Sequence, residues 1–91
     1  MSDIAAQLAE LRVQYAAKLP ARIATLAAAV ETARTDPEQL ARLRHHVHTL
    51  RGSTGSYGLI AASEQLARIE RMIDERASWD AIATAVEEIP R

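Results

Sequence analysis

Residues 4–30, IAAQLAELRVQYAAKLPARIATLAAAV, decide the fold class of this chain. Large apolar side chains recur in this segment at steps of three and four residues, which is the spacing of one face of an α-helix. These side chains belong to Ile4, Leu8, Leu11, Tyr15, Leu19, Ile23, Leu26 and Val30. Pro20 would normally end or kink a helix, because its ring removes a backbone donor. The apolar spacing passes through it without a slip, so we predict one helix kinked near Pro20 rather than two separate helices.

The next segment starts at residues 35–38, TDPE, which predict the beginning of a second helix. Asp36 or Thr35 is expected to act as the N-cap, and Pro37 suits the first helical position. The apolar stripe keeps its register across two glycines and ends at Gly58, a residue type that favours helix termini. The stripe consists of Leu40, Leu43, Val47, Leu50, Thr54 and Tyr57.

Two shorter amphipathic segments complete the chain. One resumes at Leu59 and fades over residues 74–77, and the other follows the predicted N-cap Ser78 and ends before Pro90. Their apolar positions are Ile60, Leu66, Ile69 and Ile73, then Trp79, Ile82, Val86 and Ile89. Amphipathic helices with short links bury their apolar faces most simply against one another. We therefore predict an all-α fold, an antiparallel up-and-down four-helix bundle, with residues 1–91 as a single domain.

The composition excludes several classes of function. The 91 residues suffice for one domain, and 11 Lys plus Arg against 12 Asp plus Glu give no positive field to attract nucleic acid or an anionic membrane. The absence of Cys removes disulfides, thiolate metal sites and thiol catalysis. Met1 leads directly into the amphipathic pattern, without a signal-peptide or membrane-spanning segment. We expect a cytoplasmic protein.

Residues 44–58, RHHVHTLRGSTGSYG, carry the chemistry of the chain. Gly52 and Gly55 fall inside the second predicted helix, where each costs about 0.8–1 kcal/mol relative to Ala. At about 100° per residue, His48 points roughly 130° away from the core stripe, and the two glycines lie at i+4 and i+7 on its face. The pattern predicts an exposed imidazole beside bare backbone, open to a second protein.

Three histidines lie close together, but only His48 has glycine at both i+4 and i+7. His46 turns toward the edge of the core stripe, and the i+4 neighbour of His45 is a threonine that would crowd a partner. A metal site on His45 and His48 lacks further ligands. A neutral imidazole is nucleophilic near physiological pH, and Arg44 at i−4 and Arg51 at i+3 are placed to offset the charge of a phosphoryl group.

Residues 48–70 resemble the motif of histidine phosphotransfer domains, which is His-x-Leu-Lys-Gly-Ser with a downstream Gly-Ala and a Leu-x-x-Leu-Glu. The matching residues are His48-Thr49-Leu50-Arg51-Gly52-Ser53, Gly55, Gly58-Leu59, Leu66 and Ile69-Glu70. The rest of the chain agrees with this family in its helix plan. The resemblance implies a phosphocarrier without a kinase activity or ATP site of its own.

The resemblance also implies a role for individual residues. His48 would be the phosphoacceptor, Arg51 would replace the usual lysine near the phosphoryl group, and Glu70 on the adjacent helix would bond one ring nitrogen and leave the other as nucleophile. Arginine keeps the positive charge of lysine but is bulkier and forked, so phosphate geometry and partner choice are expected to differ. The partner-access and phosphate surroundings are predicted to include Arg44, Gly52, Ser53 and Gly55.

The expected partners are receiver domains of response regulators or of hybrid histidine kinases, between whose aspartates the phosphoryl group would pass. No cofactor of its own is expected, because the receiver domain would bind the divalent cation. We expect a monomer, and Val13, which lies off the apolar stripe, is a candidate docking residue.

Two alternatives stay open. The first is a phosphoacceptor domain of a larger kinase, which would receive its phosphoryl group from ATP; the start at Met1 disfavours it. The second is an adaptor or dimerising bundle without phosphotransfer, whose glycines permit close helix approach.

Overall fold

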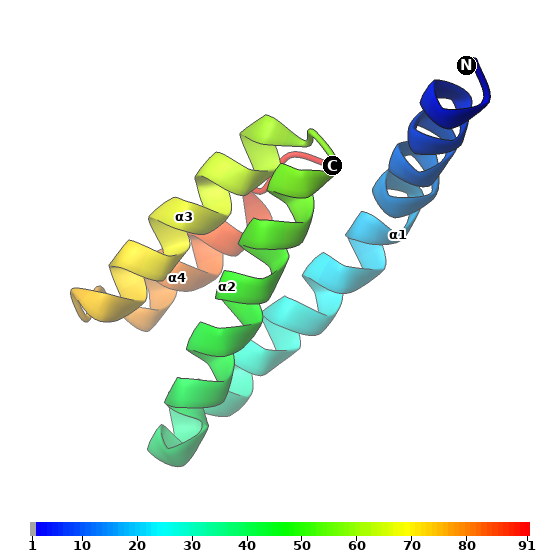
Figure 1. Ribbon diagram of the computed structural model, residues 1–91. Coiled ribbons are helices and arrows are strands. Elements are labelled where there is room, and N and C mark those ends of the chain that lie inside the picture. The colour runs from blue at the N-terminus through cyan, green and yellow to red at the C-terminus, as the bar shows by residue number, and fades with distance from the viewer. Residues whose placement is uncertain (1) are drawn as a thin grey trace.

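The computed structural model describes residues 2–91, which form four α-helices and one short 3₁₀ helix, with no strand among them (Figure 1). The elements are α1 (Ser2–Thr35), η1 (Pro37–Gln39), α2 (Leu40–Ser56), α3 (Ile60–Asp74) and α4 (Trp79–Glu87). Helix α1 packs against α2 and α4, and α3 packs against the same two helices. The chain reverses direction at each connection in Figure 1. The predicted all-α fold class is confirmed, and Pro20 lies inside a single continuous helix.

The core is aliphatic and receives side chains from all four helices. The predicted stripes of α2, α3 and α4 and the second half of the α1 stripe supply most of it, and Thr54 is fully buried with its hydroxyl donating to the carbonyl of Leu50 at 2.8 Å. The least exposed large side chains are Leu26, Val30, Leu43, Val47, Leu66, Ile69, Ile82 and Val86. Burial of apolar surface has no preferred direction, so this core supplies no chemistry of its own. Its role here is to determine which faces of the helices meet.

The connection between α1 and α2 follows the predicted capping, with one difference. The side chain of Asp36 accepts a hydrogen bond from the backbone amide of Glu38 at 3.1 Å, as an N-cap does. The turn that follows Pro37 is 3₁₀ rather than α, and α2 proper begins at Leu40. A tightened first turn is common at helix ends, and the sequence pattern does not distinguish it from α.

Helix α2 ends at the predicted glycine. Gly58 has φ of +76°, its amide donates to the carbonyl of Gly55 at 3.1 Å, and the amide of Leu59 donates to the carbonyl of Thr54 at 2.8 Å. This pair of bonds is the Schellman arrangement, which needs a left-handed residue after the helix. The N-cap of α4 is also as predicted, because Ser78 accepts from the amide of Ala81 at 3.1 Å.

The first half of α1 differs from the prediction that its whole apolar stripe is buried. A helix of 34 residues is about 51 Å long, whereas α2 with 17 residues is half that length, so α1 extends past the bundle. Residues 2–14, the α1 arm, project from it in Figure 1, and Ile4, Leu8 and Leu11 are 68%, 59% and 45% exposed. From Asp3 onward, the first buried side chain of α1 is Tyr15, which stacks on Tyr57 with ring centroids 4.6 Å apart.

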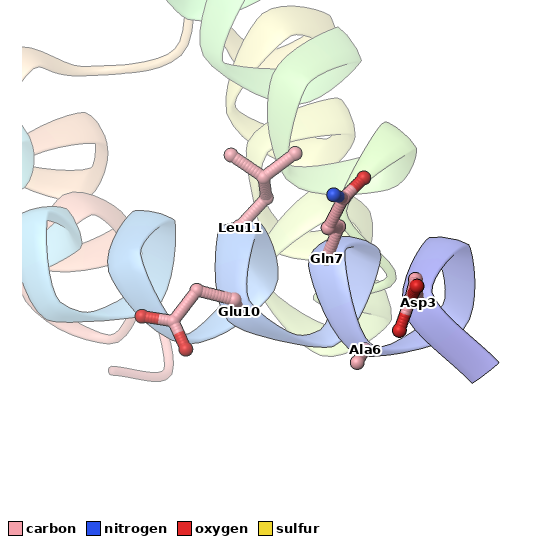
Figure 2. A pocket seen from close by; sticks show the side chains of 5 residues that line it. All are labelled: Asp3, Ala6, Gln7, Glu10 and Leu11. Atoms are coloured by element: carbon pink, nitrogen blue, oxygen red, sulfur yellow. The ribbon is translucent and has the colours of Figure 1, made fainter.

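The arm also accounts for the elongated shape. The Cα radius of gyration is 14.3 Å, against about 12 Å for a compact domain of this length. Figure 2 shows a shallow hollow on the arm whose five lining residues all belong to α1, so it has no opposite wall. Two further positions predicted for the buried stripes, Leu40 and Ile60, are exposed because each begins its helix at an end of the bundle. Within residues 2–91, no helix is both long and apolar enough to span a bilayer.

The exposed arm predicts two very different costs for the same substitution. Leu26→Ala empties a fully buried site and is expected to lower the free energy of unfolding by about 2–5 kcal/mol. Leu8→Ala removes a side chain that is mostly in water, so its effect is expected to stay within about 0.5 kcal/mol. Urea denaturation followed by circular dichroism measures both, and a cost for Leu8→Ala as large as that for Leu26→Ala would contradict the structure.

The end of α3 predicts a stabilising substitution. Arg76 has φ of +57°, and the amides of Arg76 and Ala77 bond back to Ile73 and Met72 as in a Schellman turn. A left-handed conformation costs an L-residue about 1–2 kcal/mol, a cost that glycine avoids. Glycine loses more conformational entropy on folding, which offsets part of this advantage. Arg76→Gly is therefore expected to raise the free energy of unfolding by about 0.5–1 kcal/mol.

The reverse substitution is the matched control for Arg76→Gly. Gly58→Ala puts a Cβ in the same conformation, 3.3 Å from the guanidinium of Arg12, and is expected to destabilise the fold. Equal effects of the two changes in thermal denaturation would argue against this account.

Candidate functional site

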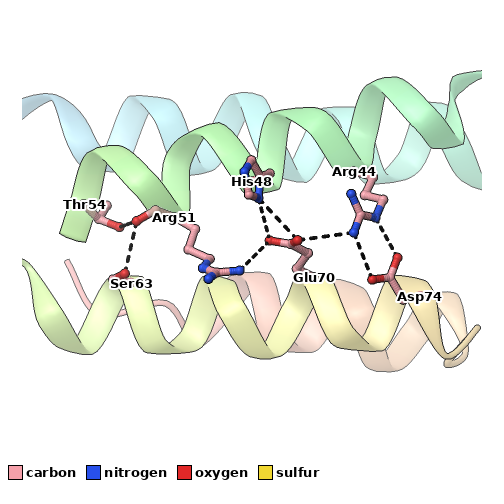
Figure 3. Close-up of polar contacts among 7 residues, drawn as sticks. All are labelled: Arg44, His48, Arg51, Thr54, Ser63, Glu70 and Asp74. Carbon is pink, nitrogen blue, oxygen red and sulfur yellow. Dashed lines mark hydrogen bonds and ion pairs between the residues drawn. The ribbon is translucent and has the colours of Figure 1, made fainter. Parts of the chain in front are cut away.

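His48 lies on the side of α2 that faces α3 and solvent, and its side chain is 60% exposed. Its Nδ1 atom lies 3.2 Å from Oε1 and 3.3 Å from Oε2 of Glu70, which projects from α3 (Figure 3). The two nitrogens of the ring are therefore unequal, because one is engaged by a carboxylate and the other is on the opposite edge of the imidazole.

The carboxylate of Glu70 is the centre of the site. Its side chain is only 10% exposed, and besides His48 it accepts hydrogen bonds from Nη1 of Arg51 at 3.2 Å and from Nη2 of Arg44 at 3.4 Å. Burial by itself raises the pKa of Glu70, but the hydrogen bonds and positive charge of His48 and Arg51 outweigh burial and lower it. Glu70 is therefore ionised at neutral pH.

The charge of Glu70 fixes the proton on His48. An ionised carboxylate can only accept hydrogen bonds, so Nδ1 of a neutral His48 must be the donor. The lone pair of the neutral ring is then on Nε2. The arrangement that the family resemblance implied, one nitrogen bonded and the other free to react, follows here from the Glu70 contact.

A second ion pair adjoins the first. Nε and Nη2 of Arg44 donate to the two carboxylate oxygens of Asp74 at 2.7 and 3.1 Å, so the pair is bidentate (Figure 3). The hydrogen bond from Arg44 lowers the pKa of Asp74, and the bond with Asp74 raises the pKa of Arg44. Arg44 thus spans the gap between Asp74 and Glu70 rather than standing free beside His48.

The two glycines of α2 lie in different surroundings. A Cβ added to Gly52 would meet nothing within 4 Å, so this backbone is open. A Cβ added to Gly55 would lie 3.2 Å from Oγ of Ser63 on α3, and that hydroxyl donates to the carbonyl of Arg51 at 3.1 Å. Gly52 lies on the face predicted for it, whereas Gly55 turns toward α3, where a small residue permits close packing of the two helices.

The remaining predicted residues surround this centre less closely. His45 is exposed, and half-buried His46 has a lowered pKa because of its burial and the neighbouring charge of His45. Ser53 is half-buried and is not among the groups bonded to Glu70, and Val13 on the arm is 66% exposed. In the part of the chain that the structure describes, no three His, Cys, Asp or Glu side chains gather in a way that would hold a metal ion.

Two contributors, Asp74 and Ser63, are not predicted from the sequence. Asp74 lies among residues 74–77, over which the third apolar pattern fades, and Ser63 lies between the apolar positions of the same segment. A signal for Asp74 was present, because it follows Glu70 by four residues while Arg44 precedes His48 by four. In antiparallel helices such equal and opposite steps bring the second pair together once the first pair is known.

The fold and the site together define a class of protein, a small helical domain that presents one histidine, oriented by a buried carboxylate, to solvent. Residues 10–91 match the family described as Hpt domain, and the chain belongs to this family. Members are phosphocarrier domains, and membership implies a histidine phosphotransfer role in a phosphorelay with receiver domains as partners. No curated protein and no solved structure matched the chain in the same comparisons.

The lowered pKa of Glu70 predicts how stability depends on pH. Because the folded state favours the charged form, Glu70 stabilises the fold above its ordinary pKa of 4.5, and this contribution is lost as the pH falls through the lowered value. We expect Glu70→Gln to lower the free energy of unfolding at pH 7 by about 1 kcal/mol, since its partners are about half exposed. The difference from wild type should shrink at pH 3.

Denaturant unfolding at the two pH values checks this expectation. Glu64→Gln, on the exposed face of the same helix, is the matched control. Its difference from wild type in the free energy of unfolding should be the same at pH 7 and pH 3. A difference between Glu70→Gln and wild type that grows toward pH 3 would contradict the assignment.

Proposed function

We propose that this domain accepts a phosphoryl group on Nε2 of His48 from the aspartyl phosphate of one receiver domain and donates it to the aspartate of another. The observation that carries the proposal is the contact of Nδ1 with buried Glu70 while 60% of the His48 side chain stays exposed. This contact orients the ring and leaves the reactive nitrogen accessible from outside the bundle.

The transfer needs little chemistry from this chain. The lone pair of Nε2 attacks phosphorus, the bond between phosphorus and the aspartyl oxygen breaks, and the aspartate leaves with the electron pair as a carboxylate. The imidazole gains positive charge as the new bond forms. Glu70 stabilises that charge through Nδ1 and is placed to accept its proton, and the return step reverses each of these changes.

Arg51 is the cation of the proposed site. It is anchored to Oε1 of Glu70 three residues along the same helix face as His48, and its side chain is 46% exposed, so the guanidinium can reach toward a phosphoryl oxygen. Charge on the partner side would be neutralised by a divalent cation that the receiver domain binds. The proposal requires no cofactor held by this chain.

The proposal includes the partners and the state of the protein. Receiver domains of response regulators or hybrid histidine kinases would approach over the open backbone at Gly52, with Val13 as a candidate docking residue. A monomeric, cytoplasmic up-and-down bundle with His48 on its second helix fits a transient carrier.

The first test is phosphoryl transfer itself. Incubation with receiver domains carrying labelled aspartyl phosphate is expected to label the wild-type domain and to leave His48→Gln unlabelled, with His45→Gln as the matched control that keeps its label. Equal labelling of wild type and His48→Gln would contradict the proposal. Labelling only by a kinase domain with ATP would assign the chain instead to a larger kinase.

The second test concerns access. A Cβ at Gly52 meets nothing within 4 Å and glutamine has the higher helix propensity, so Gly52→Gln is expected to leave the fold intact or stabilise it by up to about 1 kcal/mol. Its side chain would stand in front of the imidazole at i+4, and transfer is expected to slow by at least about tenfold. Stopped-flow transfer kinetics beside thermal denaturation separate the two effects, and an unchanged rate would show that partners approach elsewhere.

A further inference from the structure

Asp74 has no part in the proposed transfer, yet it makes the best-formed ion pair next to the site. Its two oxygens accept from Arg44 at 2.7 and 3.1 Å, whereas Arg44 reaches Glu70 by a single contact of 3.4 Å. Arg44 is therefore bound mainly to Asp74 and only weakly to the carboxylate that His48 uses.

Stability alone is a weak reason for this pair. The side chains of Arg44 and Asp74 are 47% and 48% exposed, so even a bidentate pair between them contributes only modestly to folding. Asp74 is also the last residue of α3, where a negative charge interacts unfavourably with the helix dipole. An acid in this position calls for another reason.

Competition for Glu70 supplies that reason. Its Oε2 atom faces both Nδ1 of His48 at 3.3 Å and Nη2 of Arg44 at 3.4 Å, so the two donors share one acceptor. A guanidinium released from Asp74 would be free to form a full bidentate pair with Glu70, which is the stronger kind of contact. The imidazole would then lose its acceptor. Glu70 is the α3 residue that contacts Nδ1 of His48, so the proton would no longer be held on this nitrogen.

We propose that Asp74 is a positioning residue: by holding Arg44, it reserves Glu70 for His48 and so maintains the tautomer with hydrogen on Nδ1 and a reactive Nε2. The inference rests on the proposed function for its consequence, the rate of phosphoryl transfer, but not for the tautomer itself. While Arg44 is paired with Asp74, it leaves the contact between His48 and Glu70 intact. Without Asp74, Arg44 would compete with His48 for Glu70 and slow phosphoryl transfer.

The proposal predicts an uneven response to three variants. Asp74→Asn keeps the shape of the side chain but frees Arg44, so the share of Nδ1–H tautomer is expected to fall toward that of free imidazole and transfer to slow by about tenfold. Arg44→Gln removes the competitor, so the tautomer should stay as in wild type. In the double variant, Asp74→Asn should have no further effect on tautomer or rate beyond that of Arg44→Gln alone.

The tautomer is measured from ¹⁵N chemical shifts of the His48 ring at alkaline pH, and the rate is measured from transfer by a phosphorylated receiver domain. Asp80→Asn is the matched control, because Asp80 pairs with Arg34 between α4 and α1, away from the site. It should change neither quantity. Circular dichroism melting verifies that all variants are folded.

The outcomes separate this inference from the proposed function. An unchanged tautomer in Asp74→Asn, or a double variant as impaired as Asp74→Asn, would overturn the role of Asp74, since a purely structural pair would make both single variants alike. A wild-type domain that accepts no phosphoryl group would overturn the proposed function. The ¹⁵N measurement would still decide whether Asp74, by holding Arg44, keeps Glu70 available to His48.

Discussion

One buried carboxylate organises the functional side of this bundle. Glu70 enters from α3 and accepts hydrogen bonds from three side chains of α2, which are His48, Arg51 and Arg44. A carboxylate with so little exposure stays ionised only because those donors compensate for its lost hydration. In return, its charge orients the imidazole and determines which ring nitrogen holds the proton. The same contact thus joins two helices and defines a nucleophile.

That contact depends on the register of α2 and α3. Glu70 faces His48, four residues later Asp74 faces Arg44, and seven residues earlier Ser63 faces Gly55, so the two helices run past each other in step. A shift of one residue would rotate Glu70 by about 100° away from the ring. The register is fixed by the buried core side chains of these two helices, such as Val47 and Ile69, and at one end by the turn at Gly58. Packing that is indifferent to chemistry therefore positions the chemistry.

Much of the fold could be predicted from the sequence because it depends on local rules. Caps at Asp36 and Ser78 and the turn at Gly58 involve residues within a few positions of one another, and an apolar stripe shows which face of each helix is buried. The exposure of Leu8 and its neighbours on the α1 arm could not be predicted, because a stripe does not reveal how far the covering helices extend. The 3₁₀ turn at Pro37–Gln39 could not be predicted either, because it differs too little from an α turn to leave a signal in the sequence.

The candidate site likewise has a part that follows from local sequence and a part that depends on how two helices pack. His48, Gly52 and the arginines at i−4 and i+3 could be placed from one helix alone, but the environment of Gly55 and the pairing of Asp74 depend on α3. Gly52 and Gly55 carry the same propensity cost, about 0.8–1 kcal/mol each, yet only Gly55 has a neighbour that a methyl group would touch. Packing thus explains Gly55 and leaves the cost of Gly52 unexplained by anything inside the molecule. A glycine kept open toward solvent beside an oriented imidazole makes physical sense if something outside the molecule must approach there.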